Sequence, residues 1–255
     1  MKLAVIPPYC FSTMMCLQDY QLLLPQCFHS EEYTRVAYAF SRDPKFNDTY
    51  VMLDNGAAEG EAWHPQALIV IGREFEVDEI VVPDILADYH GTLDMLEWFQ
   101  NETSETDRRG FGWMGVLQGT NMSQLLSCAE AYAETDFISS FGIPRHLLET
   151  VGDKHIRLFL ANELFKRYGD DYDMHFLGMN PSWYMEPKVL AAGAPYARGI
   201  DTSLPFVSAY HDVDIEEPGA PLVSRPEHYF EANPWEFSNL RFEQALRVLK
   251  GWCNG

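Results

Sequence analysis

The sequence predicts a single α/β domain over residues 1–255, folded as a (β/α)8 barrel of the TIM type. Three observations predict this fold class: the length of the chain, the alternation of short apolar runs with helical segments, and the polar residue that ends most of those runs. A length of 255 residues is close to the roughly 250 residues of a typical single barrel. The chain is 47% hydrophobic and 14% aromatic, so it can fill one packed core.

Seven short apolar runs are predicted to be strands. A short apolar run closed by turn-forming residues is typical of a strand buried in a parallel sheet, although periodicity alone does not distinguish it from a buried helix. The runs cover residues 2–6, 50–54, 79–84, 112–119, 137–142, 174–178 and 198–201. An eighth strand is not located, and the last unit of the barrel is expected to be irregular.

Helices are predicted beside these strands. Pro65 suits a first helical turn, because the N–H group that proline lacks is unpaired there in any case. The stretch 218–234 is proline-rich and is expected to be irregular. The alternation favours a parallel sheet, and the number of units favours a barrel over an open sheet. The predicted helices cover residues 17–24, 31–40, 66–75, 92–100, 124–133, 154–168 and 236–251.

Cysteine usage and hydropathy indicate a cytoplasmic protein without a metal site. The five cysteines are odd in number and include no C-x-x-C pair, which argues against a disulfide framework and a zinc ribbon. The histidines show no ligand spacing such as H-E-x-x-H. The first apolar run is too short for a signal peptide, and no stretch approaches the roughly 18 apolar residues of a membrane span. We expect free thiols, no cofactor and no membrane association.

The charge of the chain limits its possible partners. It has 38 acidic and 18 basic residues and a formal net charge of −20, which repels any polyanion from the molecule as a whole. The acidic run 212–217 is expected to be a solvated loop. Nucleic acid would therefore need a local basic strip, a helper protein or a homo-oligomer, because phosphate neutralisation supplies most non-specific affinity.

Polar side chains follow several of the predicted strands. In a barrel the carboxyl ends of all strands meet on one face, so residues distant in sequence converge there. Carboxylates and an amide without a metal cluster suit acid/base chemistry and a carboxylate nucleophile acting on a glycosidic bond. A further carboxylate and an amide can recognise the edge of a planar heterocycle. The residues expected to converge are Asp54, Asp84, Gln118, Ser139, Ser140 and Asp201.

Five motifs follow one another between about residues 50 and 205: Leu-Asp-Asn-Gly-Ala at 53–57, Asp84 after Ile-Val-Val-Pro, Gly-Val-Leu-Gln-Gly at 115–119, Ile-Ser-Ser-Phe-Gly at 138–142 and Gly-Ile-Asp at 199–201. In this order they resemble the queuine/archaeosine tRNA-guanine transglycosylases. The short chain is most similar to the phage-type branch of that superfamily, which inserts 7-deazaguanines into DNA.

The resemblance implies a pentosyltransferase that replaces guanine in DNA with a 7-deazaguanine such as preQ0, acting in the host cytoplasm if it is phage-encoded. Double displacement would then proceed through a covalent intermediate. Asp201 would be the nucleophile and Asp54 the general base, and both aspartates would be needed. The positions that match the family's base-binding residues are Asp84, Gln118, Gly119, Ser139, Ser140 and Phe141.

For a DNA substrate the target nucleotide would have to be flipped out of the stack. Phe141 and Trp113 are candidates to stack on its base. Phosphate contacts are expected from a small group of basic residues, namely Arg108, Arg109, Arg145 and Lys188.

Two features depart from the tRNA enzymes. Only Cys253 follows Cys128, so the zinc subdomain with its three clustered cysteines is expected to be absent. The tRNA-type nucleophile motif is Asp-x-Phe-Asp, whereas here Asp201 is followed by Thr-Ser-Leu-Pro.

Other functions remain compatible with the same residues. The exchange could act on tRNA, or a nucleoside or glycoside hydrolase could use the aspartates with water as acceptor. A barrel without activity could bind a deazapurine or a partner protein. Asp54 could also serve only the Asp-Asn-Gly turn, and Asp201 could serve only as a helix N-cap.

Overall fold

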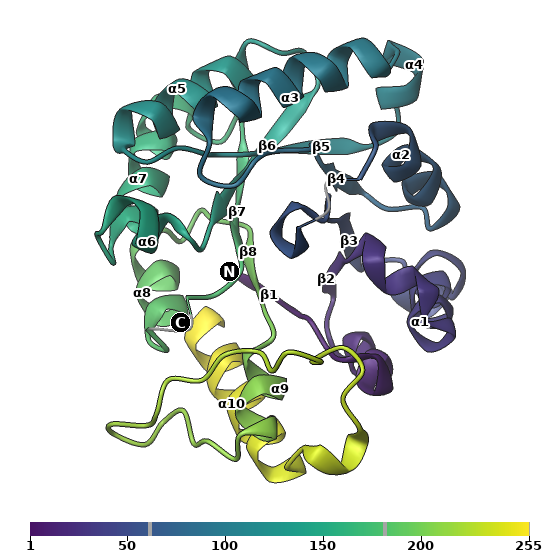
Figure 1. Ribbon diagram of the computed structural model, residues 1–255, viewed down its shortest axis with the longest axis vertical. Helices are drawn as coiled ribbons and strands as arrows, with labels where there is room; N and C mark the ends of the chain where they lie inside the picture. Colours follow the sequence, from purple (N-terminus) through teal and green to yellow (C-terminus); the bar gives the residue numbers. More distant parts are fainter. Residues whose placement is uncertain (61–62, 181–182, 255) are drawn as a thin grey trace.

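The computed structural model describes residues 1–60, 63–180 and 183–254. In these ranges eight parallel strands pair in the order β1-β8-β7-β6-β5-β4-β3-β2, and β1 also lies beside β2, so that the sheet forms a nearly closed barrel (Figure 1). The predicted (β/α)8 barrel is confirmed. The strands are β1 (Lys2–Val5), β2 (Tyr20–Leu23), β3 (Tyr50–Leu53), β4 (Glu79–Val81), β5 (Gly112–Val116), β6 (Ile138–Pro144), β7 (Asp173–Leu177) and β8 (Gly199–Thr202).

The strand that the sequence did not locate is β2. The prediction of a helix over 17–24 is wrong, because the 3-10 helix η1 (Tyr9–Leu17) ends where that helix was expected to begin, and β2 follows it. All four residues of β2 are buried. The amide of its residue Gln21 donates hydrogen bonds to the carbonyls of Met15 and Gln18 at 2.7 and 2.9 Å. A strand buried on both sides lacks the alternation that distinguishes strand from helix.

Helices surround the barrel (Figure 1). The other predicted helices are confirmed to within about three residues at each end. Pro65 occupies the first turn of α2 as expected. The short helices α4, α6, α8 and α9 were not predicted. The helices are α1 (Glu31–Arg42), α2 (Pro65–Glu74), α3 (Tyr89–Glu102), α4 (Glu105–Arg108), α5 (Met122–Ala133), α6 (Leu147–Val151), α7 (Ile156–Tyr168), α8 (Glu186–Gly193), α9 (Leu204–Tyr210) and α10 (Asn239–Asn254).

The last unit is irregular, as predicted. Residues 211–238, which we call the mouth segment, connect α9 to α10 and contain only the short 3-10 helix η5 (Pro234–Glu236) in regular structure. Tyr229 anchors this segment by donating a hydrogen bond to the carbonyl of Ile6, just beyond β1, at 2.5 Å. The helix α10 then packs on α9, α8 and β1. The Met1 ammonium donates to the Cys253 carbonyl at 3.1 Å, which ties the two ends of the chain together.

One cluster of buried hydrophobic residues extends from Leu3 to Cys253 and fills the space between the barrel and its helices. All five cysteines are free thiols, three of them buried. Among the described helices, none combines the length and apolarity needed to cross a membrane.

Replacing Gly115 with alanine is expected to destabilise the fold. A Cβ at this β5 position would come within 2.6 Å of the ring of Tyr132, a buried residue of α5, so the strand or the helix would have to shift. We expect a loss of about 1–3 kcal/mol in the free energy of unfolding, measured by urea denaturation. The control is Gly251→Ala in α10, where nothing lies within 4 Å and alanine should stabilise by up to about 1 kcal/mol. Equal effects of the two variants would contradict this packing account.

Candidate active site

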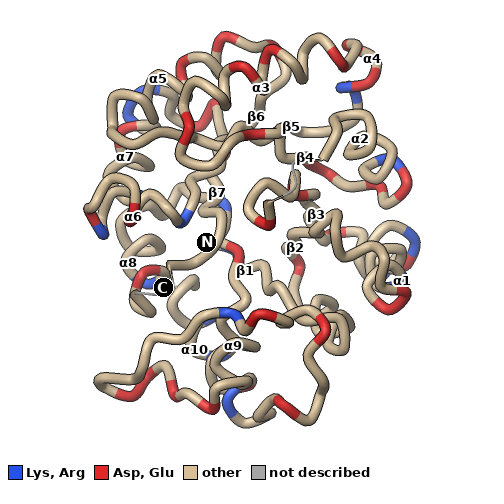
Figure 2. The backbone as a smooth tube through the Cα atoms, viewed as in Figure 1, with Lys and Arg blue, Asp and Glu red and all other residues tan. Residues whose placement is uncertain are grey.

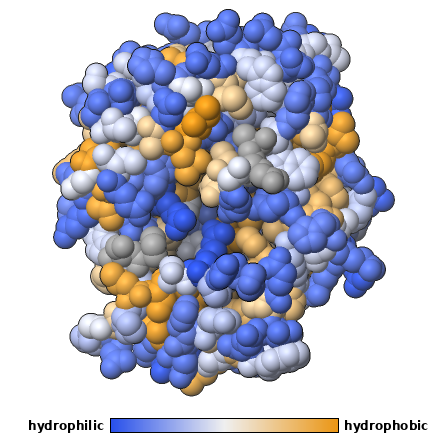
Figure 3. Space-filling model, viewed as in Figure 1, coloured by the Kyte–Doolittle hydropathy of each residue, from blue (hydrophilic) through white to orange (hydrophobic). Residues whose placement is uncertain are grey.

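A cavity of about 440 Å³ opens at the carboxyl ends of the strands. Its volume lies in the range of small-molecule sites. Figure 3 shows hydrophilic residues around a recess near the centre of the molecule. The cavity is lined by residues that follow or end five different strands, namely Asp54, Asp84, Gln118, Arg145 and Asp201. The structure therefore brings together five of the residues predicted for the site.

Asp84 is held by two amides and is almost completely buried. Asn55 donates to Oδ1 and Gln118 donates to Oδ2, both at 2.5 Å. Burial raises the pKa of Asp84 to about 6, and the two amide hydrogen bonds oppose that rise. The group is therefore mostly ionised at pH 7. A carboxylate has about four acceptor positions, so two remain for donors on a ligand.

The amide of Gln118 has a defined orientation. Its Oε1 accepts hydrogen bonds from the Ala87 N–H at 2.8 Å and from His146 Nε2 at 2.9 Å, while its Nε2 donates to Asp84. Burial lowers the pKa of His146 to about 4, so its ring is neutral and places its proton on Nε2. One N–H of Gln118 remains available to an acceptor on a ligand.

Asp54 is the carboxylate with the most perturbed acidity in the cavity. It is 9% exposed, and burial together with the nearby carboxylates of Glu59, Asp201 and Asp84 raises its pKa to about 8. At pH 7 the empty site therefore holds Asp54 in its protonated form. A group in this state can first donate a proton and afterwards accept one.

Asp201 lies in β8 and is 3% exposed. Its Oδ1 accepts a hydrogen bond from the Gly178 N–H at 2.8 Å and lies 3.1 Å from Nε2 of His175. Asp201 and Asp54 thus share one cavity from strands on different sides of the barrel. One carboxylate is held by donors and the other carries a proton, which is the division of roles that paired acid/base sites need.

The mouth segment contributes to the rim of the cavity. Arg225 forms an ion pair with Glu59 at 3.4 Å and donates from Nε to Ser203 Oγ at 3.0 Å. A second cavity of about 290 Å³ lies beside the first and shares Arg145, Arg225 and Glu59 with it. The rim therefore carries two arginines next to hydroxyl groups.

Four of the predicted base-binding residues do not line the cavity, namely Gly119, Ser139, Ser140 and Phe141. The sequence predicted a strand over residues 137–142 whose two hydroxyls face the site, but the strand continues to Pro144. Ser139 Oγ accepts from the Trp113 N–H at 3.1 Å, and Ser140 Oγ donates to Glu79 at 2.5 Å inside the barrel. The expected position of the hydroxyls at the cavity is therefore wrong.

The two aromatic side chains expected to stack on a base are buried in the core. Phe141 packs on Tyr172 with ring centroids 4.6 Å apart. Trp113 is 1% exposed and donates from Nε1 to the Arg108 carbonyl at 2.9 Å. Gly119 does not line the cavity either; its φ of 153° and its close approach to Gln124 require glycine at the turn after Gln118.

Of the predicted phosphate contacts, only Arg145 lines the cavity. Arg108 and Arg109 precede β5 and therefore lie at the opposite end of the barrel. There Arg108 donates to the Thr103 carbonyl at 2.7 Å, and Arg109 pairs with Glu105. Lys188 is an exposed residue of the outer helix α8. These three positions do not converge with the carboxylates.

Sequence reasoning missed several residues of the site. Asn55 was interpreted only as a turn residue, although an amide beside a strand-end carboxylate was a usable signal. His146 follows the true end of β6 and was missed because that strand was ended too early. Arg225 lies in the irregular mouth segment, where no periodic pattern marks it. Within the described residues, no group of three or more His, Cys, Asp or Glu is arranged to hold a metal ion.

Replacing Asp54 with asparagine is expected to stabilise the protein. In the unfolded chain Asp54 ionises near pH 4 and in the folded protein near pH 8, so the wild type loses stability as pH rises between these values. Asparagine does not titrate. We expect Asp54→Asn to gain about 1–3 kcal/mol at pH 7, and the gain to be larger at pH 8 than at pH 5.5. Urea denaturation at the three pH values measures it.

The control is Asp94→Asn on the exposed side of α3, whose effect should not change over this pH range. A gain at Asp54 that is the same at pH 5.5 and pH 8 would contradict the raised pKa.

The arrangement can hold a planar, polar molecule, donate a proton to it and present a carboxylate to an electrophilic carbon. Asp84 and Gln118 offer the hydrogen bonds, Asp54 offers the proton, and Asp201 offers the carboxylate. No protein-family model matches the chain, and no curated protein shows significant similarity to it.

Proposed function

We propose that the protein exchanges guanine in DNA for a free 7-deazaguanine base by double displacement at Asp201. The observation that carries this proposal is the convergence of Asp54, Asp84, Gln118 and Asp201 in one cavity. These four residues are the ones that the resemblance to tRNA-guanine transglycosylases assigned to catalysis and to recognition of the base edge.

The hydrogen-bonding groups of the cavity complement the edge of guanine. That edge presents N1–H and N2–H donors beside the O6 acceptor. The free acceptor positions of Asp84 can take the two donors, and the free N–H of Gln118 can donate to O6. Adenine presents an acceptor at N1 and an amino group at position 6, so it would oppose like groups. This supports a guanine-type base, with or without nitrogen at position 7.

The first displacement removes guanine. A carboxylate oxygen of Asp201 attacks C1′, the C1′–N9 bond breaks, and the departing base takes the proton that Asp54 carries in the empty site. The products are a glycosyl ester on Asp201, neutral guanine and ionised Asp54. The burial that raises the pKa of Asp54 thus favours the protonation state required at the start.

The second displacement reverses these roles. N9 of the incoming 7-deazaguanine attacks C1′, its proton passes to Asp54, and the bond between C1′ and Asp201 breaks. Asp201 is released as a carboxylate and Asp54 is again protonated. Asp54 therefore acts as acid in one half of the cycle and as base in the other.

The rim supports a nucleotide rather than a free nucleoside as the target. The second cavity places Arg145 and Arg225 beside the first, where a phosphate next to the flipped nucleotide would be neutralised. Acidic residues are distributed over the outer helices (Figure 2), so such contacts are local. A helper protein or a second copy of the chain would supply the further basic surface that a net charge of −20 requires.

The exchange is tested directly with purified protein, DNA and isotope-labelled guanine or 7-deazaguanine. We expect the label to enter DNA and a covalent protein–DNA adduct to survive denaturation when the free base is omitted. Asp201→Asn should abolish both, because an amide is a poor nucleophile for C1′. Mass analysis of the nucleosides identifies the inserted base. The matched control Asp94→Asn should exchange like the wild type.

Each alternative function gives a different result in this assay. Exchange in tRNA but not in DNA would move the substrate to tRNA. Release of free guanine without incorporation would indicate a hydrolase. Deazapurine binding without turnover, unchanged by Asp201→Asn, would indicate a binding protein. The absence of exchange in both nucleic acids would overturn the proposal.

Base selectivity is expected to depend on Asp84. Asp84→Asn removes the charge that accepts the two guanine donors and should raise the KM for the free base about 10- to 100-fold. The control is Ser139→Ala, which should leave this KM unchanged because the hydroxyl bonds the Trp113 backbone away from the cavity. Initial exchange rates at varied base concentration measure both values. An unchanged KM in Asp84→Asn would place base recognition elsewhere.

A further inference from the structure

His175 lies inside the barrel between Asp201 and Tyr20 and is fully buried. It belongs to β7, where its register partners are Gly142 of β6 and Gly199 of β8. A Cβ at Gly199 would come 2.4 Å from Cε1 of Tyr20. Glycine at this position therefore leaves the room in which the tyrosine ring reaches the imidazole.

An arginine defines the direction of the hydrogen bonds in this cluster. Arg198 Nε lies 3.1 Å from Tyr20 Oη, and a guanidinium only donates, so the tyrosine oxygen is the acceptor there. The hydroxyl proton of Tyr20 is then donated to Nδ1 of His175 at 2.8 Å. Burial lowers the pKa of His175, so the ring is neutral and carries its one proton on Nε2. Nε2 donates to Oδ1 of Asp201 at 3.1 Å.

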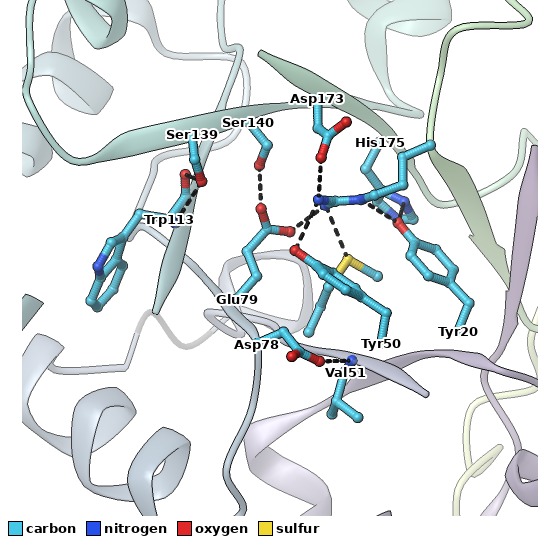
Figure 4. A network of polar contacts seen from close by, with 12 residues as sticks. Tyr20, Tyr50, Val51, Asp78, Glu79, Trp113, Ser139, Ser140, Asp173 and His175 are labelled. Atoms are coloured by element: carbon cyan, nitrogen blue, oxygen red, sulfur yellow. Dashed lines mark hydrogen bonds and ion pairs between the residues drawn. The ribbon is translucent and has the colours of Figure 1, made fainter. Parts of the chain in front are cut away.

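The position of Arg198 is itself maintained by polar partners, of which Tyr20, Tyr50, Glu79 and Asp173 are labelled in Figure 4. Its guanidinium donates to Tyr50 Oη at 2.9 Å and to Asp173 at 3.2 Å, and it forms an ion pair with Glu79. Ser140 donates to the other oxygen of Glu79. Tyr20 and His175 are therefore held from the interior of the barrel, on the side away from the cavity.

The two donors to Asp201 act on the same oxygen. His175 Nε2 and the Gly178 N–H both bond Oδ1. Every hydrogen bond that the described residues make to this carboxylate goes to Oδ1, and the side chain lines the cavity. The two oxygens are therefore distinct: one is anchored, and Oδ2 keeps its lone pairs for a reaction partner.

We propose that His175 is a positioning residue that anchors Asp201 through Oδ1 and presents Oδ2 to C1′ of the nucleotide. This inference rests on the proposed function, in which Asp201 attacks that carbon. As the Oδ2–C1′ bond forms, the C1′–N9 bond breaks and Oδ1 becomes the carbonyl oxygen of the ester, still bonded to His175 and Gly178. When the second base attacks, the Oδ2–C1′ bond breaks and its electron pair returns to the carboxylate. No proton leaves His175 in either step.

Two substitutions at His175 separate positioning from simple filling of space. His175→Leu fills the volume without a donor, and we expect kcat for base exchange and the rate of adduct formation to fall about 10- to 100-fold. The KM for the free base should stay near the wild-type value, because Asp54, Asp84 and Gln118 are unchanged. His175→Gln can place an amide N–H near the position of Nε2 and should recover most of the loss. The control is Tyr172→Phe, which removes one hydroxyl hydrogen bond from a half-buried ring outside the barrel and should keep wild-type kinetics.

The outcomes distinguish this inference from the proposed function. An active wild type with His175→Leu at wild-type kcat would overturn the positioning role alone. Equal losses in His175→Leu and His175→Gln, with KM raised in both, would show general disruption of the site and would also overturn it. A wild type without exchange would overturn the proposed function, and the positioning role with it.

The hydrogen-bond arrangement has a readout that needs no activity. Nitrogen-15 NMR of histidine-labelled wild type should include, besides the neutral ring of His146, a neutral ring protonated at Nε2 at pH 7 that is assigned to His175 by its loss in His175→Gln. An imidazolium or a ring protonated at Nδ1 would contradict the arrangement. Because this NMR measurement uses only the wild type and His175→Gln, it tests the hydrogen-bond arrangement even if His175→Leu does not fold.

Discussion

The burial of three carboxylates in one small cavity is the constraint on which the site depends. Each loses hydration there and repels the others, so each needs its own compensation. Asp84 is compensated by two amides, and Asp201 by an imidazole and a backbone N–H. Burial and the neighbouring carboxylates raise the pKa of Asp54, which keeps a proton instead. The difference in compensation is the physical basis of the different chemical roles that we propose for the three groups.

The barrel interior is organised to supply part of that compensation. Parallel barrels fill their interior with side chains, which are most often apolar. Here an Arg198–Glu79 ion pair, two tyrosines and His175 occupy it, and Gly199 beside His175 leaves space for the ring of Tyr20. A buried polar network is costly unless every member is satisfied, and a satisfied one has a single arrangement. Hydrogen bonds from Arg198 through Tyr20 and His175 thus connect the amino-terminal end of the barrel to Asp201 and restrict the position of its carboxylate.

The charged residues at the rim of the cavity are more exposed to solvent than those inside the barrel. Arg145 and Arg225 are partly or largely exposed, and Arg225 belongs to an irregular segment fastened by a few side-chain contacts such as that of Tyr229. Exposed charges are screened by salt and carry less energy than buried ones. The buried residues at the bottom of the cavity are therefore held in one arrangement, whereas the exposed arginines of the rim can adjust. This combination suits a small molecule bound inside the cavity and a larger partner bound at its rim.

The sequence by itself determined the barrel and four residues of its site, because apolar runs that end in Asp54, Asp84, Gln118 and Asp201 are local features and parallel topology places strand ends on one face. Only the tertiary structure decided that residues 20–23 form a strand, since a doubly buried strand has the composition of a buried helix. Pairing with β5 and β7 set the length of β6, which moved Ser139 and Ser140 away from the cavity. Contacts between distant segments also decided the positions of His175 and Arg225, for which no local pattern exists.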